Sequence, residues 1–118
     1  MVKRVPCPTP VGTLEVRVAD NFVARGLGLL VGPPLGATEG LLIAPCSSIH
    51  TLGMAYPIDV VFLDREARVL RVCRAVRAGR MRFRFRAHAV LELRSGAAER
   101  QGLTPGVRLP DLAAALRA

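Results

Sequence analysis

The sequence lacks long hydrophobic runs, although 51% of its residues are hydrophobic. No apolar stretch approaches the ~20 residues that a helix needs to cross a bilayer, so the sequence indicates a soluble protein. The first residues, MVKRVPCPTPVG, begin with basic side chains but have no continuous apolar stretch of the kind that marks a secretory signal. We therefore expect a cytoplasmic protein.

Cysteine is scarce and its spacing is uninformative. The three cysteines are Cys7, Cys46 and Cys73, an odd number with no C-x-x-C pair. This pattern argues against a disulfide framework and against a zinc ribbon. A metal site built from Cys46, His50, Asp59 and His88 has no recognisable ligand spacing, so we expect neither a metal nor another cofactor.

Acidic residues are also few, with nine against seventeen basic ones, which leaves a formal net charge of +8. Lys3 is the one lysine, and every other basic residue is arginine. Such a balance attracts phosphate-bearing partners, although a GC-rich genome would produce the same composition. At 118 residues the chain is predicted to form one domain, 1–118, with a hydrophobic core of its own.

Hydrophobic periodicity predicts more strand than helix. Alternation and β-branched content predict strands over 12–19, 40–44, 58–63, 68–76, 81–86 and 89–94, with a brief closing strand over 107–109. Short helices are expected from Asp20 to about Leu30, over 97–101, and after Pro110. Residues 46–57 are interpreted as a loop. The predicted fold is β-rich α+β, a compact mixed sheet curled into a partly closed barrel or sandwich with two or three short helices.

One segment of this pattern is strongly basic. Residues 65–86 contain nine arginines and a single acid, Glu66. Within it, apolar Met81, Phe83 and Phe85 alternate with Arg80, Arg82, Arg84 and Arg86. We expect a strand with a row of arginines on one face and the phenylalanines turned to the core on the other. A solvated arginine face that protects a sheet edge is the simpler interpretation.

Two motifs resemble one known family. Residues 56–64 (YPIDVVFLD) are followed about thirty residues later by 91–96 (LELRSG), and Arg25-Gly26-Leu27 precedes both. Over roughly 13–109 the chain resembles DUF192, a bacterial and archaeal domain of unknown function. The resemblance implies a compact β-rich fold and supplies no established activity.

The polar loop departs from the usual family pattern. Many members read W-M-K-N-T there, whereas this chain reads Ile49-His50-Thr51-Leu52-Gly53-Met54 and is similar to a Ser-Ile-His-Thr variant. Roles of the usual lysine or asparagine are therefore not carried over.

The same loop holds the candidate site residues. Cys46 and His50 lie four positions apart, so a thiolate–imidazole pair is conceivable, and a small half-buried structural thiol is the alternative. His50 lies among serine and threonine rather than in an apolar run, which makes it the leading candidate for ligand contact or proton transfer. The alternative is a structural histidine that only hydrogen-bonds the loop to its neighbours. The ligand-binding candidates are Ser48, His50, Thr51, Met54, Asp59 and Glu92.

Two of these candidates are acidic residues within apolar strands. Asp59 needs partners if it is buried, and backbone amides of the polar loop, His50 or a nearby arginine would serve. Glu92 is expected on the surface, since alternation turns it away from its neighbouring leucines. Convergence of both carboxyl groups near His50 would create a small polar pocket.

Three functional hypotheses remain. The first is a module that binds a small ligand or peptide near His50. The second is binding of nucleic acid or another polyanion through Arg77, Arg80, Arg82, Arg84 and Arg86. The third is a small enzyme that uses His50 with Asp59 or Glu92 as general acid and base, and the lack of a complete catalytic signature favours the binding hypotheses.

Overall fold

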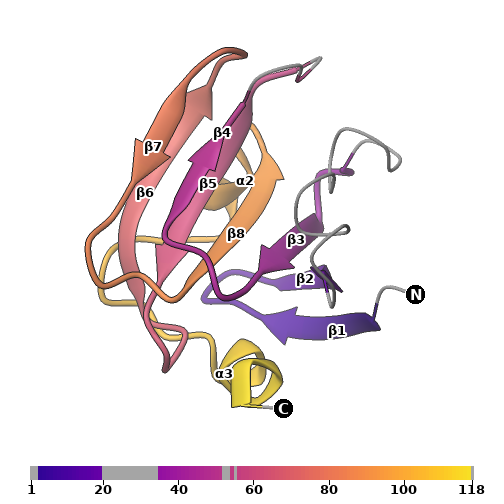
Figure 1. Cartoon of the computed structure of the whole chain (residues 1–118). Helices are drawn as coiled ribbons and strands as arrows, with labels where there is room; N and C mark the ends of the chain where they lie inside the picture. The colour runs from indigo at the N-terminus through magenta and orange to yellow at the C-terminus, as the bar shows by residue number, and fades with distance from the viewer. Residues whose placement is uncertain (1–2, 20–34, 52–53, 55, 118) are drawn as a thin grey trace.

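A computed structural model describes residues 3–19, 35–51, 54 and 56–117 of the chain. The β-rich α+β class predicted from the sequence is confirmed, and this part of the chain contains eight strands and two helices (Figure 1). The strands are β1 (Lys3–Pro8), β2 (Thr13–Ala19), β3 (Glu39–Ile43), β4 (Ser48–His50), β5 (Ile58–Leu63), β6 (Val69–Val76), β7 (Met81–Phe83) and β8 (Ala89–Arg94). The helices are α2 (Ala97–Arg100) and α3 (Pro110–Arg117). No helix of the described ranges is long and apolar enough to cross a membrane.

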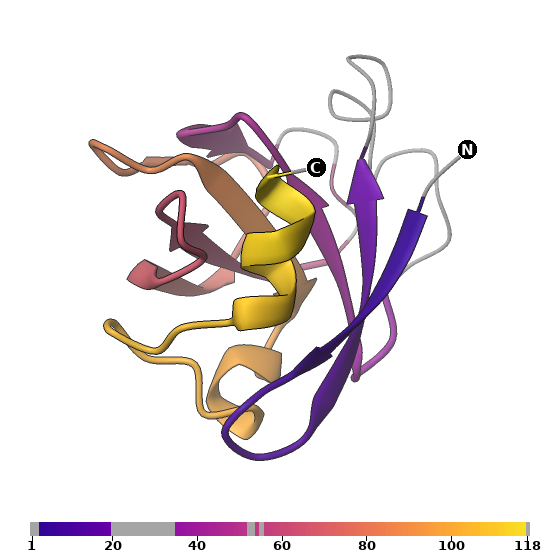
Figure 2. The ribbon, with the colours of Figure 1, turned by 90° about the horizontal axis from the view of Figure 1, so that it is seen from below.

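Six strands form one open sheet in the order β1-β2-β3-β8-β5-β6. Only β2 and β3 run parallel to each other, and the other neighbours in this sheet are antiparallel. The predicted partly closed barrel is wrong, because β1 and β6 lie at opposite edges of the sheet. Pro6 and Pro8 in β1 have no backbone N–H to donate to a further strand, and α3 lies beside β1 (Figure 2).

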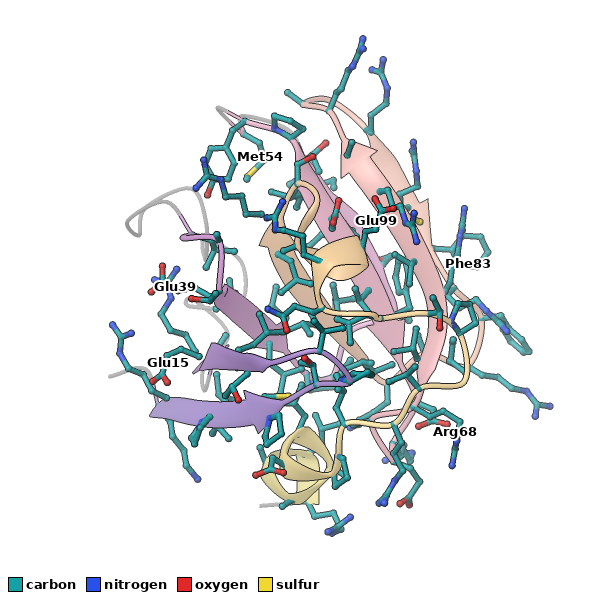
Figure 3. All side chains as sticks on the ribbon, turned by 180° about the vertical axis from the view of Figure 1, so that it is seen from behind. Glu15, Glu39, Met54, Arg68, Phe83 and Glu99 are labelled. Atoms are coloured by element: carbon teal, nitrogen blue, oxygen red, sulfur yellow. The ribbon has the colours of Figure 1, made fainter. Side chains whose placement is uncertain are left out.

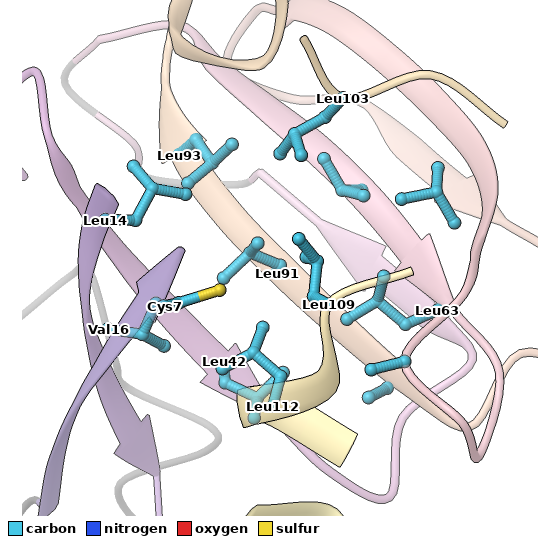
Figure 4. Close-up of a cluster of buried hydrophobic side chains, with 14 of the residues drawn as sticks. Cys7, Leu14, Val16, Leu42, Leu63, Leu91, Leu93, Leu103, Leu109 and Leu112 are labelled. Carbon is cyan, nitrogen blue, oxygen red and sulfur yellow. The ribbon is translucent and has the colours of Figure 1, made fainter. Parts of the chain in front are cut away.

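The two central strands bury side chains on both faces of the sheet. In β8, Ala89, Leu91 and Leu93 belong to the cluster shown in Figure 4, and Val90 belongs to a second cluster on the opposite face. Every residue of β5 is buried. Strands enclosed in this way lose the alternation of polar and apolar residues. Their β-branched and leucine-rich composition still identified them, and the predicted bounds 58–63 and 89–94 are confirmed.

Short or proline-containing strands were harder to predict. Strand β1 was not expected, because its two prolines are depleted in strands. Strand β4 lies inside the predicted loop 46–57, and it pairs with β7 in a separate two-stranded sheet. The closing strand over 107–109 is reduced to a single bridge between Arg68 and Arg108. The helix expected from Asp20 lies outside the described residues.

Asp59, a completely buried carboxylate in β5, connects three separate parts of the fold. One oxygen, Oδ1, accepts a hydrogen bond from the backbone N–H of Ala75 at 2.9 Å. The other, Oδ2, accepts bonds from the N–H groups of Gly96 and Ala98, each at 3.0 Å. Both Ala75 and Gly96 have positive φ angles, 50° and 91°. The partners are therefore backbone amides of β6 and of the start of α2, not those of the polar loop.

Replacing Asp59 tests this connection. In Asp59→Asn an amide N–H₂ takes the place of one carboxylate oxygen and faces a backbone donor, which leaves at least one backbone N–H without its acceptor and the buried N–H₂ group without one of its own. We expect a loss of about 2–4 kcal/mol in the free energy of unfolding, measured by urea denaturation.

Asp64 offers a matched control. Its Oδ1 also accepts two backbone hydrogen bonds, from Glu66 and Arg68, but in an exposed turn where water replaces a lost partner. Asp64→Asn should cost less than about 1 kcal/mol. Equal losses in the two variants would contradict a special role for Asp59.

Candidate functional site

The two-stranded sheet of β4 and β7 has one face toward the protein body and one toward solvent. Ile49 pairs with Arg82, and both side chains are half-buried. Ile49 packs against the second hydrophobic cluster. Ser48 pairs with Phe83 and His50 pairs with Met81, and these four residues are exposed. The outward face of this small sheet therefore carries His50 together with apolar side chains.

Three large apolar residues at alternate positions of this segment are exposed. We call Met81, Phe83 and Phe85 the aromatic strip; their exposed fractions are 71%, 61% and 69%. Figure 3 shows Phe83 pointing away from the protein body. The prediction that Phe83 and Phe85 face the core is wrong. Alternation separates the two faces of this segment but does not say which one is buried, because an arginine stem also packs on apolar surface.

The arginines that alternate with the aromatic strip do not form one row on a strand face. Strand β7 ends at Phe83 and residues 85–86 form a turn, so the expected line of four arginines on one strand face is not formed. Arg82 and Arg84 are half-buried, whereas Arg77, Arg80 and Arg86 are exposed. The Arg86 guanidinium lies 5.7 Å from the centre of the Phe85 ring.

Backbone contacts hold the strip in place. Arg71 of β6 donates a hydrogen bond from Nη1 to the Phe83 carbonyl at 2.8 Å. Thr51, which is 1% exposed, donates from Oγ1 to the Arg77 carbonyl and accepts a bond from the Arg80 N–H at 2.9 Å. Thr51 thus fastens the turn between β6 and β7. The backbone that presents the strip is tied both to the large sheet and to the end of β4.

The other candidate residues of the loop lie in different parts of the structure. Met54 is half-buried and packs against the second hydrophobic cluster. The Cys46 thiol is half-buried and donates a hydrogen bond to the Ser48 carbonyl at 2.9 Å. His50 is exposed on the outward face. These positions do not assemble a polar pocket around His50.

Asp59 and Glu92 lie on opposite faces of the large sheet. In the β5–β8 register, Asp59 is opposite Leu93 of the first cluster, and Glu92 is opposite Val60 of the second. The Asp59 carboxylate is occupied by three backbone amides. The convergence of both carboxyl groups near His50 is therefore absent, and with it the general acid–base arrangement.

Glu92 is buried rather than on the surface, with 4% of its area exposed. It lies between Leu41 of β3 and Val60 of β5, in the face that packs the second cluster. We find no hydrogen bond to its carboxyl group from any described residue. Burial raises the pKa of Glu92 from 4.5 to about 7. The surface prediction was wrong because β8 is central and both of its faces are covered.

A pocket of about 370 Å³ lies at the end of β8. Leu35, Tyr56, Pro57, Arg94 and Ser95 line it. The Tyr56 hydroxyl accepts a hydrogen bond from the Leu35 N–H at 3.4 Å. The sequence did not single out these residues for a site, although the family motifs 56–64 and 91–96 contain four of them. Within the described ranges, no group of three or more histidine, cysteine, aspartate or glutamate side chains could hold a metal ion.

The buried carboxyl group makes stability depend on pH. The unfolded chain ionises Glu92 near pH 4.5, while the folded protein keeps its proton until about pH 7. The free energy of unfolding should therefore fall as the pH rises between these values, by about 3 kcal/mol from this group. Glu92→Gln removes this ionisable group. The free energy of unfolding of Glu92→Gln minus that of the natural protein should therefore increase by about 3 kcal/mol from pH 4 to pH 8, measured by denaturant titration. Exposed Glu99→Gln is the control and should show no such pH dependence. If the difference in the free energy of unfolding between Glu92→Gln and the natural protein does not change with pH, the raised pKa of Glu92 is refuted.

Comparisons with known proteins place this fold in one family. The sequence profile of DUF192, described as "Uncharacterized ACR, COG1430", matches residues 7–110. The UPF0127 protein PH1112 of Pyrococcus horikoshii is 43% identical over 61 residues, which are 49% of this chain and 53% of that protein. The UPF0127 protein PF1050 of Pyrococcus furiosus is 37% identical over 62 residues, 48% of this chain and 52% of that protein. The chain thus matches about half the length of these two curated relatives.

Two crystal structures share the fold. A protein of unknown function from Novosphingobium aromaticivorans has a TM-score of 0.76 and 21% identity over 92% of this chain and 84% of its own. A candidate transcription regulator from Sinorhizobium meliloti has a TM-score of 0.80 and 21% identity over 96% of this chain and 95% of its own. At this identity the likeness concerns the fold alone. The profile match over residues 7–110 shows the family: the chain belongs to DUF192, an uncharacterised family, as its motifs indicated.

Proposed function

We propose that this protein binds single-stranded nucleic acid on the aromatic strip and the arginines around it. The observation that carries the proposal is the exposure of Phe83 and Phe85, 61% and 69%, on a segment rich in arginine. Exposed aromatic rings with basic neighbours are the usual means of holding unpaired bases without sequence preference. The main objection raised by the sequence, that these rings face the core, no longer applies.

Charge complementarity favours a polyanion as the partner. Residues 65–86 carry nine arginines and one acid, Glu66, which is already paired with Arg108 at 3.3 Å. Arg77, Arg80 and Arg86 are exposed close in sequence to the strip. Their guanidinium groups can neutralise phosphates while the rings contact bases. An acidic partner is thus attracted by the same surface that offers apolar contact.

The exposed rings favour single strands over duplexes. A stacked and paired base hides its flat face, so an exposed phenylalanine gains contact only with an unpaired base. Phe83 ends β7 and Phe85 lies in the turn that follows, and both rings are exposed, so each can contact a separate base. Arg86 beside the Phe85 ring adds a planar cation to the same platform.

The other two hypotheses are less well supported. A ligand pocket centred on His50 would require enclosure, and His50 is an exposed side chain on the outward face of β4. Acid–base catalysis would require a carboxyl group near His50, whereas Asp59 is occupied by backbone amides and Glu92 is buried between strands. His50 instead fits the proposed surface, beside Met81. The Sinorhizobium meliloti protein is named as a candidate transcription regulator, which agrees with a nucleic-acid role.

Removing the rings should weaken binding to single strands. For Phe83→Ala and Phe85→Ala we expect each variant to lose about 1–3 kcal/mol of binding free energy for a single-stranded oligonucleotide. Arg80→Gln should remove one phosphate contact. The slope of log K against log salt should therefore become less negative by about 0.7. Fluorescence anisotropy with labelled oligonucleotides at several salt concentrations measures both effects.

Matched variants elsewhere test the location. Val11→Ala removes an apolar side chain that is 69% exposed, and Arg117→Gln removes an exposed charge from α3. Neither should change affinity by more than about 0.5 kcal/mol. No binding at low salt, tighter binding to duplexes, or binding only to anionic lipid vesicles would each overturn the proposal.

A further inference from the structure

We propose a second, independent binding site: the pocket at the end of β8 takes a small monocarboxylate with an apolar body. The described residues that line this pocket are Leu35, Tyr56, Pro57, Arg94 and Ser95. The carboxylate would bind Arg94 and the two hydroxyl groups, and the apolar body would lie against Leu35 and the Tyr56 ring. The proposal does not depend on the nucleic-acid surface, since it involves none of the same residues.

The side chain of Arg94 lies on the face of the sheet where the pocket is. In the β5–β8 register Arg94 is opposite Ile58, a member of the second cluster, and residues directly opposite each other in neighbouring strands share one face. Leu35 belongs to the same cluster and Tyr56 packs against it. Arg94 therefore contributes its side chain, and not only its backbone, to the wall of the pocket.

The polar side chains of the pocket can all donate hydrogen bonds. A guanidinium group has five N–H donors and no acceptor. The Tyr56 hydroxyl accepts a hydrogen bond from the Leu35 N–H at 3.4 Å, which leaves its own O–H to donate. Ser95, next to Arg94, offers a second hydroxyl. A ligand that uses these groups together must present acceptor oxygens to them.

A carboxylate matches the charge of this set of donors. Arg94 is the one charged residue among the described residues that line the pocket, so it balances a single negative charge. Arginine and a carboxylate also pair through two parallel N–H···O bonds. A phosphate monoester carries a charge of about −1.5 to −2 near neutral pH, and part of that charge would have no counterpart here.

The burial of the lining residues gives the ligand its orientation. Leu35 is 3% exposed and Tyr56 is half-buried, whereas Pro57 and Arg94 are exposed. The carboxylate is therefore expected at the mouth, beside Arg94, with the apolar body directed inward to Leu35. The volume of about 370 Å³ lies in the lower part of the range for small-molecule pockets, about 300–1,000 Å³. A short aliphatic chain or a single ring fits that space.

Tyr56 gives this pocket a readout of its own. The chain contains one tyrosine and no tryptophan, so all of its tyrosine fluorescence comes from the pocket. A ligand that contacts the Tyr56 ring should change this emission. The aromatic rings of the aromatic strip are phenylalanines, so a ligand bound there contacts no tyrosine.

The experiment titrates the full chain with sodium hexanoate and follows Tyr56 emission, with calorimetry as a second measure of affinity. Hexanamide replaces the carboxylate by a neutral amide, hexylamine replaces it by a cation, and inorganic phosphate is an anion without an apolar body. We expect a saturable change with hexanoate. Each of the other three compounds should bind at least about tenfold more weakly, because a charge-assisted contact or the apolar contact is lost.

The conditions remove two competing effects. Sodium chloride at matched ionic strength is the blank, which separates binding from a general salt effect. The titration is made at pH 6, below the pKa of about 7 that burial gives Glu92. This carboxyl group of the same strand is then mostly protonated and does not compete for Arg94.

Variants assign the contacts. Arg94→Gln should weaken hexanoate binding at least about tenfold, and Arg94→Lys, which keeps the charge but not the paired hydrogen bonds, should lose less. Tyr56→Phe should weaken binding about threefold to tenfold, measured by calorimetry because the emission is lost. Arg117→Gln is the control and should bind as the natural protein does. Arg94 is exposed, so thermal melting of the Arg94 variants without ligand should match that of the natural protein.

Several results would overturn the proposal. One is the absence of heat and of an emission change with hexanoate or phenylacetate at about 10 mM, ten times a millimolar Kd. Equal binding of hexanoate and hexanamide would exclude a carboxylate site, and phosphate binding as tight as hexanoate binding would indicate a general anion site instead. Unchanged affinity in Arg94→Gln would remove the central contact. None of these results affects oligonucleotide binding to the aromatic strip, which is measured separately.

Discussion

The buried carboxylate of Asp59 is the constraint on which the arrangement of β5, β6 and α2 depends. It accepts backbone hydrogen bonds from Ala75 on one side and from Gly96 and Ala98 on the other. Without it, three backbone donors around a buried position would lose their acceptor, and the N–H of buried Ala98 would be left unsatisfied. This interaction holds the irregular backbone of β6 and the start of α2 against the central strands. The remaining elements pack around β5, β6 and α2.

The two faces of the large sheet have different roles. The first cluster lies under α2 and α3 and contains only apolar side chains, Cys7 among them. The opposite face buries Glu92 and borders the pocket of Arg94 and Tyr56. Strands β4 and β7 extend from that side and expose the aromatic strip to solvent. The proposed nucleic-acid surface therefore lies on the side of the sheet whose core cluster contains no residue of α2 or α3.

Much of the fold could be predicted from the sequence, while the candidate site could be predicted only in part. Strands β5 and β8 are β-branched or leucine-rich segments bounded by turns, so local preference and tertiary packing agree. His50 and the arginines of 65–86 were identified as candidates by residue type. The pocket around Tyr56 and Arg94 was not, because its walls come from segments distant in the sequence. No local sequence pattern indicates that these segments lie close together in the fold.

The sequence by itself determined the family, the β-rich class and the excess of positive charge, since each depends on residue identity and short-range order. The tertiary structure alone decided which face of an alternating segment is buried. Phe83 and Phe85 alternate with arginine as core residues would, yet they are exposed, while Glu92 alternates with leucine as a surface residue would, yet it is buried. Burial depends on which layers lie above and below a strand, and strand pairing over long sequence separations determines those layers.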